Sequence, residues 1–287
     1  MPYDEFEEGR TIWRYMDYSK FEDLVTTGEL YMPNAYAYEE TDINEGRIHQ
    51  TYVDVIERAL QIQARLPWTR NPEAKKRIKR QVREELRAIC GLIKSNRANS
   101  FISCWTDRET EDSRMWSSFT SHSRGIAIKS TVGLVAEQLD EGCDSLDQTL
   151  MLDQGFIKYD RERLHTRLNL ENLHDLTLPL FSLDGGARNF THEREYRFVA
   201  VDQEGRGEDL QIFTEAPPRG NVVTPGRRRA RRRQHFRHRH IRVPINCDRM
   251  MLEIRTCPRA SARFIQKVTN LLESNLISCI VSPSTLR

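Results

Sequence analysis

The chain has 287 residues, and its 44 Lys and Arg against 42 Asp and Glu give a formal net charge of +2. Hydrophobic residues make up 38% and charged residues 30%, a balanced composition that argues against a wholly disordered chain. No stretch approaches the roughly 20 consecutive apolar residues of a membrane span, and the acidic N-terminus lacks the apolar core of a secretory signal. We therefore expect a folded cytoplasmic protein with no membrane partner.

The first third of the chain combines short strand and helix patterns with a long helical stretch. The short helix is expected to begin after Ser19 and to end at Gly28. From residue 44 to residue 97, apolar residues recur at helical spacing, which predicts a helical insertion. In chain order, the earlier patterns predict a strand, a helix and a strand: Thr11–Met16, Lys20–Thr27 and Leu30–Met32.

The remainder predicts strands that alternate with helices. Together these patterns indicate an α+β fold with a single mixed sheet of about eight short strands, and no internal repeat. Because the last strand follows the basic segment, we expect one domain over residues 1–287 that carries a loop insertion. The expected strands are Ser100–Trp105, Gly125–Lys129, Gly155–Tyr159, Glu195–Val201, Ile241–Ile245, Met251–Arg255 and Ile277–Val281. The expected helices follow Asp112 or Ser113 and cover Leu134–Leu139, Asn169–Leu183 and Ala260–Ser274.

Positive charge gathers in one late segment. Between Glu215 and Asp248 lie 32 residues with ten arginines and no acid, so this segment carries +10 and the rest of the chain −8. We expect residues 216–242 to contact nucleic acid or an acidic protein in a salt-sensitive, largely sequence-independent way. The alternative is a solvated, partly disordered loop over residues 216–240 without a partner. The arginines expected to bind are Arg227, Arg228, Arg229, Arg231, Arg232 and Arg233.

The strongest candidate for chemistry is the acidic and basic cluster at residues 192–197. If a strand covers it, alternation places Glu193, Glu195 and Arg197 on one face. Two carboxylates about 7 Å apart on a strand raise the pKa of one of them, while a guanidinium lowers the pKa of the nearer one. The alternative is an ordinary exposed strand face with an ion pair.

A second candidate is Arg14, which stands between Trp13 and Tyr15. An arginine inside an aromatic strand either emerges at a sheet edge or is held for bidentate recognition of an anion. In the helix after residue 112, spacing favours core positions for Met115 and Phe119. Trp116 and Ser117 are then the better candidates for a cleft.

Metal chemistry has little support. The six cysteines form no CxxC pair and the eight histidines show no ligand spacing, so we expect reduced, mostly buried thiols and no metal site. The glycine loops of nucleotide-binding proteins and the hydrolase and zinc-protease motifs are also missing.

Segments in order over nearly the whole chain carry a family resemblance. The chain resembles the prokaryotic domain of unknown function (DUF) 2971 family, and its Met115-Trp116 pair and Glu-x-Glu-Tyr-Arg element are the most specific shared features. It departs from the family in having Phe119 where a tyrosine is usual and Arg14 where a lysine is more common, and the arginine block looks like a local addition. The family name implies no activity. The matching segments are Trp13–Tyr15, Phe21–Leu24, Glu29–Asn34, Asp42–Gly46, Phe101–Trp105, Ser113–Phe119, Gly125–Ile128, Phe190–Arg197 and Leu252–Ile254.

A weaker similarity concerns fold and layout. An arginine on an early strand, a short helix leading to another strand, and a late strand with Glu-x-Glu also resemble ADP-ribosyltransferases. This similarity implies that Arg14 holds the pyrophosphate or ribose of NAD and that Glu195 stabilises the developing oxocarbenium ion, while Glu193 orients the acceptor. The remaining residues that it implies for NAD binding are Tyr15, Tyr31, Trp116 and Ser117.

We therefore predict a cytoplasmic bacterial enzyme resembling an ADP-ribosyltransferase. It would use NAD as substrate and modify a macromolecule or nucleotide as a stress, toxin or anti-phage defence effector. The first alternative is a non-catalytic nucleic-acid- or protein-binding module that uses the Arg-rich segment. The second is a carboxylate-dependent nuclease with Mg²⁺, which is disfavoured because no lysine or histidine accompanies the glutamates in the strand. The target and the oligomeric state stay open.

Overall fold

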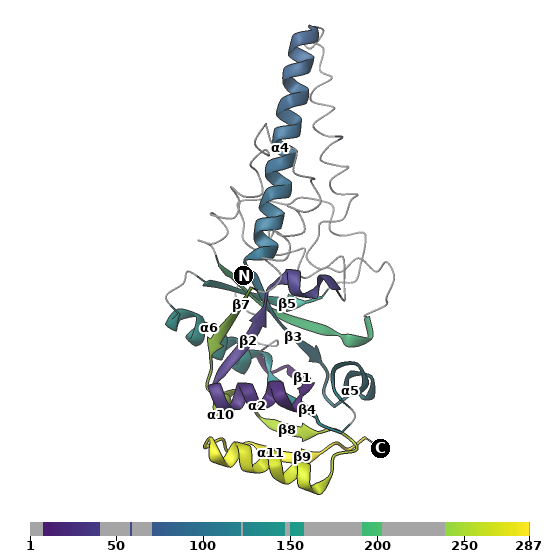
Figure 1. The fold of residues 1–287 in the computed structure, drawn as a ribbon, viewed down its shortest axis with the longest axis vertical. Coiled ribbons are helices and arrows are strands. Elements are labelled where there is room, and N and C mark those ends of the chain that lie inside the picture. The colour runs from purple at the N-terminus through teal and green to yellow at the C-terminus, as the bar shows by residue number, and fades with distance from the viewer. Residues whose placement is uncertain are drawn as a thin grey trace, which may run out of the picture.

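A large mixed sheet organises the fold (Figure 1). The computed structural model describes residues 8–40, 58, 71–121, 123–146, 150–157, 191–202 and 239–286. Within these ranges seven strands form one sheet in the order β5-β6-β3-β1-β4-β8-β9, and β8 and β9 are its parallel neighbours. The strands are β1 (Thr11–Asp17), β3 (Ser100–Asp107), β4 (Gly125–Thr131), β5 (Leu150–Phe156), β6 (Glu195–Asp202), β8 (Glu253–Thr256) and β9 (Ile280–Pro283).

A two-stranded sheet and a set of helices complete the described part. The small sheet pairs β2 (Glu29–Pro33) with β7 (His240–Pro244). The helices are α2 (Tyr18–Thr27), α4 (Pro72–Ala98), α5 (Ser113–Phe119), α6 (Val132–Ser145), α10 (Cys247–Met250) and α11 (Ala262–Ser274), with 3-10 turns η1 (Ala35–Glu40) and η5 (Thr191–Glu193). The predicted α+β class and mixed sheet are confirmed for these residues. The expectation of a single sheet is wrong, because β2 and β7 pair only with each other in the described part of the chain. The assignment of the chain to one domain stays a prediction.

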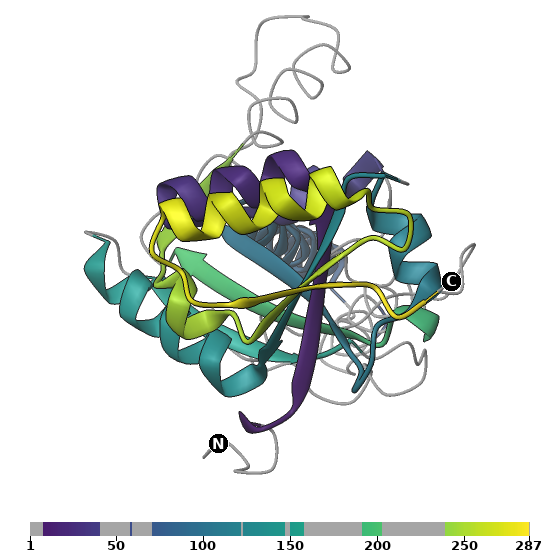
Figure 2. The same cartoon turned by 90° about the horizontal axis from the view of Figure 1, so that it is seen from below.

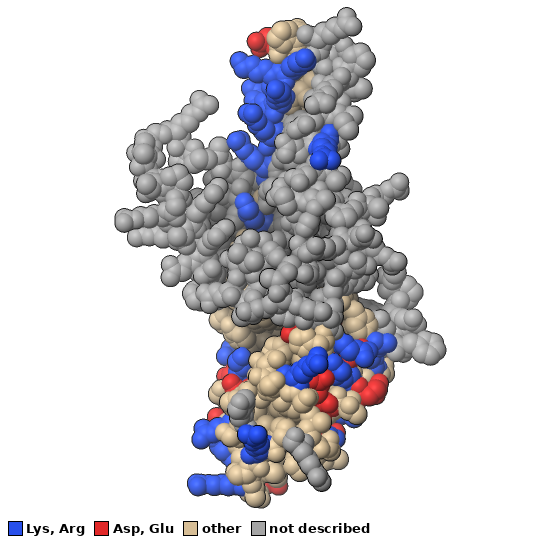
Figure 3. All heavy atoms as spheres, turned by 90° about the vertical axis from the view of Figure 1, so that its right-hand side faces the viewer, with Lys and Arg blue, Asp and Glu red and all other residues tan. Residues whose placement is uncertain are grey.

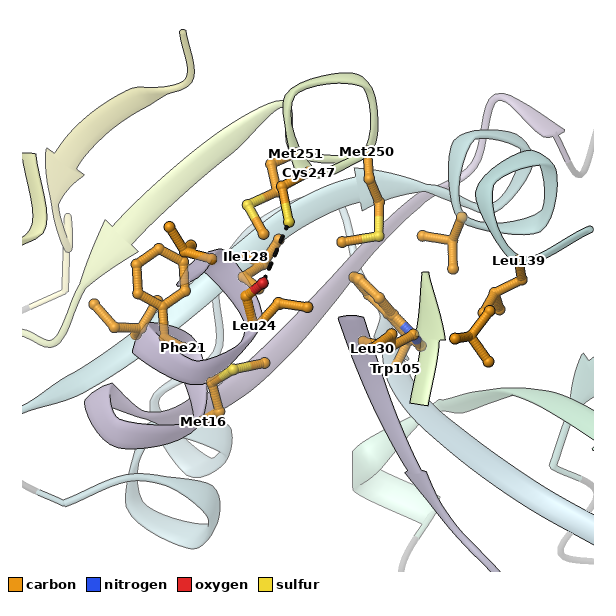
Figure 4. Packing of buried hydrophobic residues seen from close by; sticks show 14 of the residues in the cluster. Met16, Phe21, Leu24, Leu30, Trp105, Ile128, Leu139, Cys247, Met250 and Met251 are labelled. Carbon is orange, nitrogen blue, oxygen red and sulfur yellow. Dashed lines mark hydrogen bonds between the residues drawn. The ribbon is translucent and has the colours of Figure 1, made fainter. Parts of the chain in front are cut away.

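The main core fills one face of the large sheet. Helices α2 and α11 lie side by side over this face (Figure 2), and the rings of Tyr18 and Phe264 meet edge to face at 5.5 Å. Figure 4 shows Phe21 and Leu24 of α2 packed toward Ile128 of β4. Burial of such side chains contributes about 1.5–3 kcal/mol each, so this layer holds the helices to the sheet.

The opposite face of the sheet carries two smaller apolar clusters. One gathers Trp13, Tyr15 and Trp116 beneath α5. The other gathers Ile102, Val199 and further residues beside η1. Strand alternation explains the division, because Ile12 and Met16 of β1 point into the main core while their neighbours point away from it. The polar candidates of β6, Glu195 and Arg197, lie on this second face. They alternate along the strand with Tyr196 and Phe198, which point into the main core.

Most predicted helix ends agree with the structure. Gly28 ends α2 in the left-handed conformation at φ 65°, which glycine adopts without steric cost. The side chain of Asp112 accepts hydrogen bonds from the backbone N–H groups of Arg114 and Met115 and so caps α5. The expected start after Ser19 is wrong: α2 begins at Tyr18, since β1 runs directly into it.

Two further expectations differ from the structure. Strand β5 covers Leu150–Phe156 rather than 155–159, because it pairs with the whole of β6 from Leu150 opposite Asp202 to Phe156 opposite Tyr196. Phe119 was expected in the core with Met115, yet it is 47% exposed. In the seven-residue helix α5, Met115 and Trp116 form the inward side, and Phe119 ends the helix at the surface.

Several expectations fall on residues outside the described ranges. These are the helix at residues 169–183, most of the insertion before residue 71, and the basic loop at residues 216–238. The part of the insertion that the structure describes forms α4.

Among the described helices, none combines the length and the apolar character that a membrane crossing requires.

Candidate functional site

Arg14 is a half-buried cation without a carboxylate partner in the described part of the chain. Strand β1 pairs with β3 at Ile12 and Trp13 and then continues beside β4. Just past this point, Nη1 of Arg14 donates a hydrogen bond to Oγ of Ser103 at 2.6 Å. Burial lowers the pKa of the guanidinium. A guanidinium has five N–H donors, so Arg14 retains donors and an uncompensated charge for an anion.

Glu195 and Arg197 form a buried ion pair on β6. Nε of Arg197 donates to Oε1 of Glu195 at 2.8 Å, and Nη2 donates to Oε2 at 3.1 Å. The two residues are only 7% and 3% exposed. Such a bidentate arrangement fixes the plane of the carboxylate. Removing either partner would leave a buried charge, at a cost of about 3–5 kcal/mol.

Glu193 lies before the strand, in the turn η5, and not on the strand as expected. Strand β6 begins at Glu195, and Arg194 between them has a left-handed backbone with φ 46°. Strand alternation therefore does not apply to Glu193. Burial and the charge of Glu195 nevertheless raise its pKa to about 7, against the opposing effect of Arg197. This carboxyl group can exchange a proton near neutral pH.

The turn that carries Glu193 is held from β3. Nη2 of Arg108, the residue after β3, donates to the backbone oxygen of His192 at 2.7 Å. The backbone N–H of Ile157 donates to the backbone oxygen of Glu195 at 2.9 Å, which ties β5 to the start of β6. The position of Glu193 is therefore set by neighbours on both sides of β6.

Tyr38 lies beside Cys104 of β3, and charges on β1 and β6 influence its hydroxyl. Sγ of Cys104 lies 3.8 Å from the hydroxyl oxygen of Tyr38. Burial and the nearby Cys104 raise the pKa of Tyr38 well above its ordinary value, whereas Arg14 and Arg197 both lower it. The sequence analysis missed Tyr38, Ser103 and Cys104.

The strand register shows on which face of the sheet Arg14 and the Glu195–Arg197 pair lie. Trp13 is opposite Thr106 on β3, and Thr106 is opposite Glu195 on β6. Trp13 therefore shares a face with Glu195, and Arg14 begins on the other face. Arg14 stays on that face within β1, where its guanidinium lies over the ring of Trp105, a residue of the main core, at 5.8 Å from the ring centroid. The register therefore does not bring Arg14 onto the face of Glu195 and Arg197.

The aromatic candidates lie elsewhere. The rings of Tyr15 and Trp116 are 5.1 Å apart in a T-shaped contact, and the residues are 8% and 4% exposed. The hydroxyl of Tyr15 accepts from the backbone N–H of Asp112, and Nε1 of Trp116 donates to Glu111. Their faces are covered in this conformation, so they form part of a packed cluster beneath α5.

The other two residues expected to bind NAD are at the surface. Oγ of Ser117 is exposed on α5 and donates to the backbone oxygen of Arg114. Tyr31 is 42% exposed on β2, where its ring lies 4.8 Å from that of His240. Among the contacts of the described residues, neither Ser117 nor Tyr31 touches Arg14, Glu193 or Glu195.

The predicted arginine cluster lies at residues 227–233, outside the described ranges. The five cysteines that the structure describes are free thiols, as expected. In the described ranges no three potential metal ligands come together, and the expectation of no metal stays a prediction.

No protein-family model, curated protein or solved structure matches the chain. The resemblances to the DUF2971 family and to ADP-ribosyltransferases therefore stay predictions from the sequence. The function has to be inferred from the residues of the chain itself.

Proposed function

We propose that the chain is an enzyme that transfers the ADP-ribosyl group of NAD to a nucleophilic acceptor. One observation carries this proposal: Glu193, near the Glu195–Arg197 pair, has a pKa of about 7. Arg14 adds a guanidinium that has no carboxylate partner among the described residues. This combination offers an anion-binding group, a fixed carboxylate and a proton acceptor.

The transfer assigns one task to each group. The bond between C1′ of the ribose and the nicotinamide nitrogen breaks, and its electron pair leaves with nicotinamide. Positive charge then develops on the ribose, where the fixed carboxylate of Glu195 stabilises it. Arg14 binds the pyrophosphate and holds the substrate in place. The acceptor forms a new bond to C1′ and passes its proton to Glu193.

The environment of Glu193 supports its role as the base. A general base is most effective when its pKa lies near the working pH, and the pKa of Glu193 is about 7. It has no hydrogen-bond partner among the described residues, so its carboxylate is available to an acceptor. Glu195 differs in this respect, since both of its oxygens are engaged by Arg197.

The test measures NAD turnover by the purified chain. Nicotinamide release and transfer of label from adenylate-labelled NAD are followed with cell-extract protein, RNA and nucleotides as acceptors. Glu193→Gln and Arg14→Met are compared with Glu273→Gln and Arg263→Met, which make the same changes at exposed positions of α11. Glu195→Gln is a poor test, because it removes the carboxylate from a buried ion pair and so threatens folding.

We expect Glu193→Gln to lower turnover by at least about 100-fold, the usual contribution of a general base, while the α11 variants keep full activity. Wild-type turnover should rise with pH through a pKa near 7. The proposal fails if the wild type neither binds nor cleaves NAD, or if Glu193→Gln and Arg14→Met remain fully active.

A further inference from the structure

Helix α4 extends away from the large sheet on the side opposite α11 (Figure 1). It covers Pro72–Ala98, 27 residues, which corresponds to a length of about 40 Å. It begins at Asn71, whose side chain accepts a hydrogen bond from the backbone N–H of Glu73 at 2.9 Å. Its described N-terminal half is thus a capped, well-formed helix that offers its surface to solvent.

This helix is strongly basic. It contains nine Lys and Arg and three Glu, a net charge of +6 in a chain whose total is +2. Lys and Arg side chains gather along it in Figure 3. The exposed cations are Lys75, Lys76, Arg77, Lys79, Arg80, Arg83, Arg87 and Lys94.

Most of these cations share one side of α4. Lys75, Lys79, Arg83 and Arg87 follow one another at intervals of four residues, so they form a row with a rise of about 6 Å per step. Lys76 and Arg80 form a second row beside it. The two rows span an arc of about 140° at 100° per residue. We call them the basic face of α4.

The basic face has little compensating charge among the described side chains. Within the described side chains, the helix has one ion pair, between Arg80 and Glu84 at 3.8 Å, and both side chains are highly exposed. No described carboxylate pairs with the row that begins at Lys75. Like charges four residues apart destabilise a helix by about 0.2–0.5 kcal/mol per pair. A helix that only needed solubility would alternate the two signs along this row.

The shape of the charge distribution favours an extended polyanion. The row from Lys75 to Arg87 covers about 18 Å, more than a single phosphate group can engage. The sequence of α4 contains no Phe, Tyr or Trp, so it offers no platform on which bases could stack and no aromatic anchor for a lipid interface. Lysine and arginine without aromatic residues are typical of contacts to the nucleic-acid backbone.

We propose that the basic face of α4 binds the sugar–phosphate backbone of a nucleic acid, independently of base sequence. This proposal concerns a helix that the sequence analysis assigned to a helical insertion, and it is separate from the Arg-rich segment at residues 216–242. It does not depend on NAD turnover, so it stands or falls independently of the proposed function.

The test uses the full chain and measures fluorescence anisotropy with labelled duplex DNA, duplex RNA and single-stranded RNA over a range of KCl concentrations. The variant replaces Lys75, Lys79, Arg83 and Arg87 by Gln. A matched control removes four exposed cations outside α4, with Lys20, Arg124, Arg259 and Arg263 replaced by Gln. Circular dichroism checks that both variants retain their helices.

We expect the α4 variant to bind at least about tenfold more weakly and to lose up to about four units of the salt slope, since each phosphate contact contributes about 0.9. The control should bind within about twofold of the wild type, and two unrelated sequences should bind alike. Equal affinity of the two variants would overturn the proposal. Binding only to anionic lipid vesicles or to acidic protein would overturn it as well, and would identify that other partner.

Discussion

Asp107 and Arg194 hold each other through two hydrogen bonds, one from a side chain and one from the backbone. Nη2 of Arg194 donates to Oδ2 of Asp107 at 2.9 Å, and the backbone N–H of Asp107 donates to the backbone oxygen of Arg194 at 2.9 Å. Arg194 is the left-handed residue between η5 and β6, at φ 46°. Because a non-glycine residue rarely adopts this conformation without external support, Asp107 helps to fix the position of Glu193.

We predict that Asp107→Ala releases this turn. Asp107→Ala removes the ion pairs with Arg194 and Arg10, whose side chains are 57% and 39% exposed. Because exposed pairs contribute about 0.2–1 kcal/mol each, we expect the free energy of unfolding to fall by about 1 kcal/mol. Loss of the turn also exposes Glu193, and its pKa should move from about 7 toward its ordinary value. Urea denaturation and carbon NMR titration of the Glu193 carboxyl measure the two effects.

The variant Arg10→Gln is the control for Asp107→Ala. Arg10 also contacts Asp107, through Nη1 at 3.3 Å, but it has no contact with η5. Arg10→Gln should cost less than about 0.5 kcal/mol, as expected of a half-exposed pair, and should leave the Glu193 pKa in place. A Glu193 pKa that stays near 7 in Asp107→Ala would contradict the positioning role.

The pKa of Glu193 also predicts how stability depends on pH. Its folded-state pKa is about 7, against an ordinary pKa of 4.5 in the unfolded chain, so between these values the folded state binds more protons than the unfolded state. Ionisation of Glu193 therefore destabilises the fold as pH rises through this window, and the effect is absent below it. We expect Glu193→Gln to be more stable than the wild type at pH 8 by about 1 kcal/mol, after allowance for solvent screening.

Urea denaturation at pH 8 and at pH 4 measures this difference. The two proteins should be equally stable at the lower pH, where Glu193 is protonated in both states. Glu273→Gln on α11 supplies the control, because Glu273 is exposed and this substitution should change little at either pH. A stability difference of the same size at both pH values would contradict the assignment.

Local patterns in the sequence were enough to predict most strands and helices of the described part. Period-two aromatic runs identified β1 and β6, and caps such as Asp112 and Gly28 located helix ends. Strand β5 was shifted because its position depends on pairing with β6, which no local pattern reveals. Phe119 was misplaced because helical spacing does not say which side of a short helix faces the sheet.

The candidate site was predictable only in part. The motif at residues 193–197 indicated that two acids and a guanidinium would interact, yet the left-handed residue at 194 could not be anticipated. Tyr38 and Cys104 come from separate segments and meet only through the order of β1, β3 and β6. Ser103 and Cys104, between the apolar Ile102 and Trp105, were the available signal in the sequence of β3.

The ion pair between Glu195 and Arg197 predicts strong coupling. Each single change, Glu195→Gln or Arg197→Met, should cost about 3–5 kcal/mol because it removes one charge of a buried ion pair. The double variant should cost clearly less than the sum of the two. A double-mutant cycle by urea denaturation measures this coupling energy. Additive costs would show that the two residues act on folding independently.

Glu111 joins the C-terminal segment to the sheet. Its carboxylate, 6% exposed, accepts hydrogen bonds from Arg255, Trp116 and the backbone N–H of Thr285. Burial acts to raise the pKa of Glu111, but the hydrogen bonds from Ser284, Thr285 and Arg255 together lower it. The stability that it contributes is therefore present above its unfolded-state pKa and is lost as pH falls through its lower folded-state pKa.

We expect Glu111→Ala to cost about 3 kcal/mol, since it leaves several buried donors unsatisfied. Hydrogen exchange at Thr285 and Leu286 should accelerate in this variant, because the bonds that hold the C-terminal segment are lost. Glu109→Ala, a change at an exposed neighbouring position, should leave both measurements unchanged. Slow exchange at Thr285 in Glu111→Ala would mean that other contacts hold the segment.

The contacts of Arg14 predict that its substitution abolishes anion binding without lowering the stability of the fold. A cation that only maintained the fold would have a carboxylate partner, and its loss would be costly. Arg14 instead has a hydroxyl partner, Ser103, and a desolvated charge, so Arg14→Met should leave stability unchanged or raise it by up to about 1 kcal/mol.

Inorganic pyrophosphate should raise the melting temperature of the wild type, because a ligand at 100 times its Kd adds about 2.7 kcal/mol. This shift should be absent in Arg14→Met, reduced in Arg14→Lys, which keeps the charge but not the planar fork, and unchanged in Arg263→Met. A destabilised Arg14→Met together with no pyrophosphate effect on the wild type would make Arg14 a structural residue.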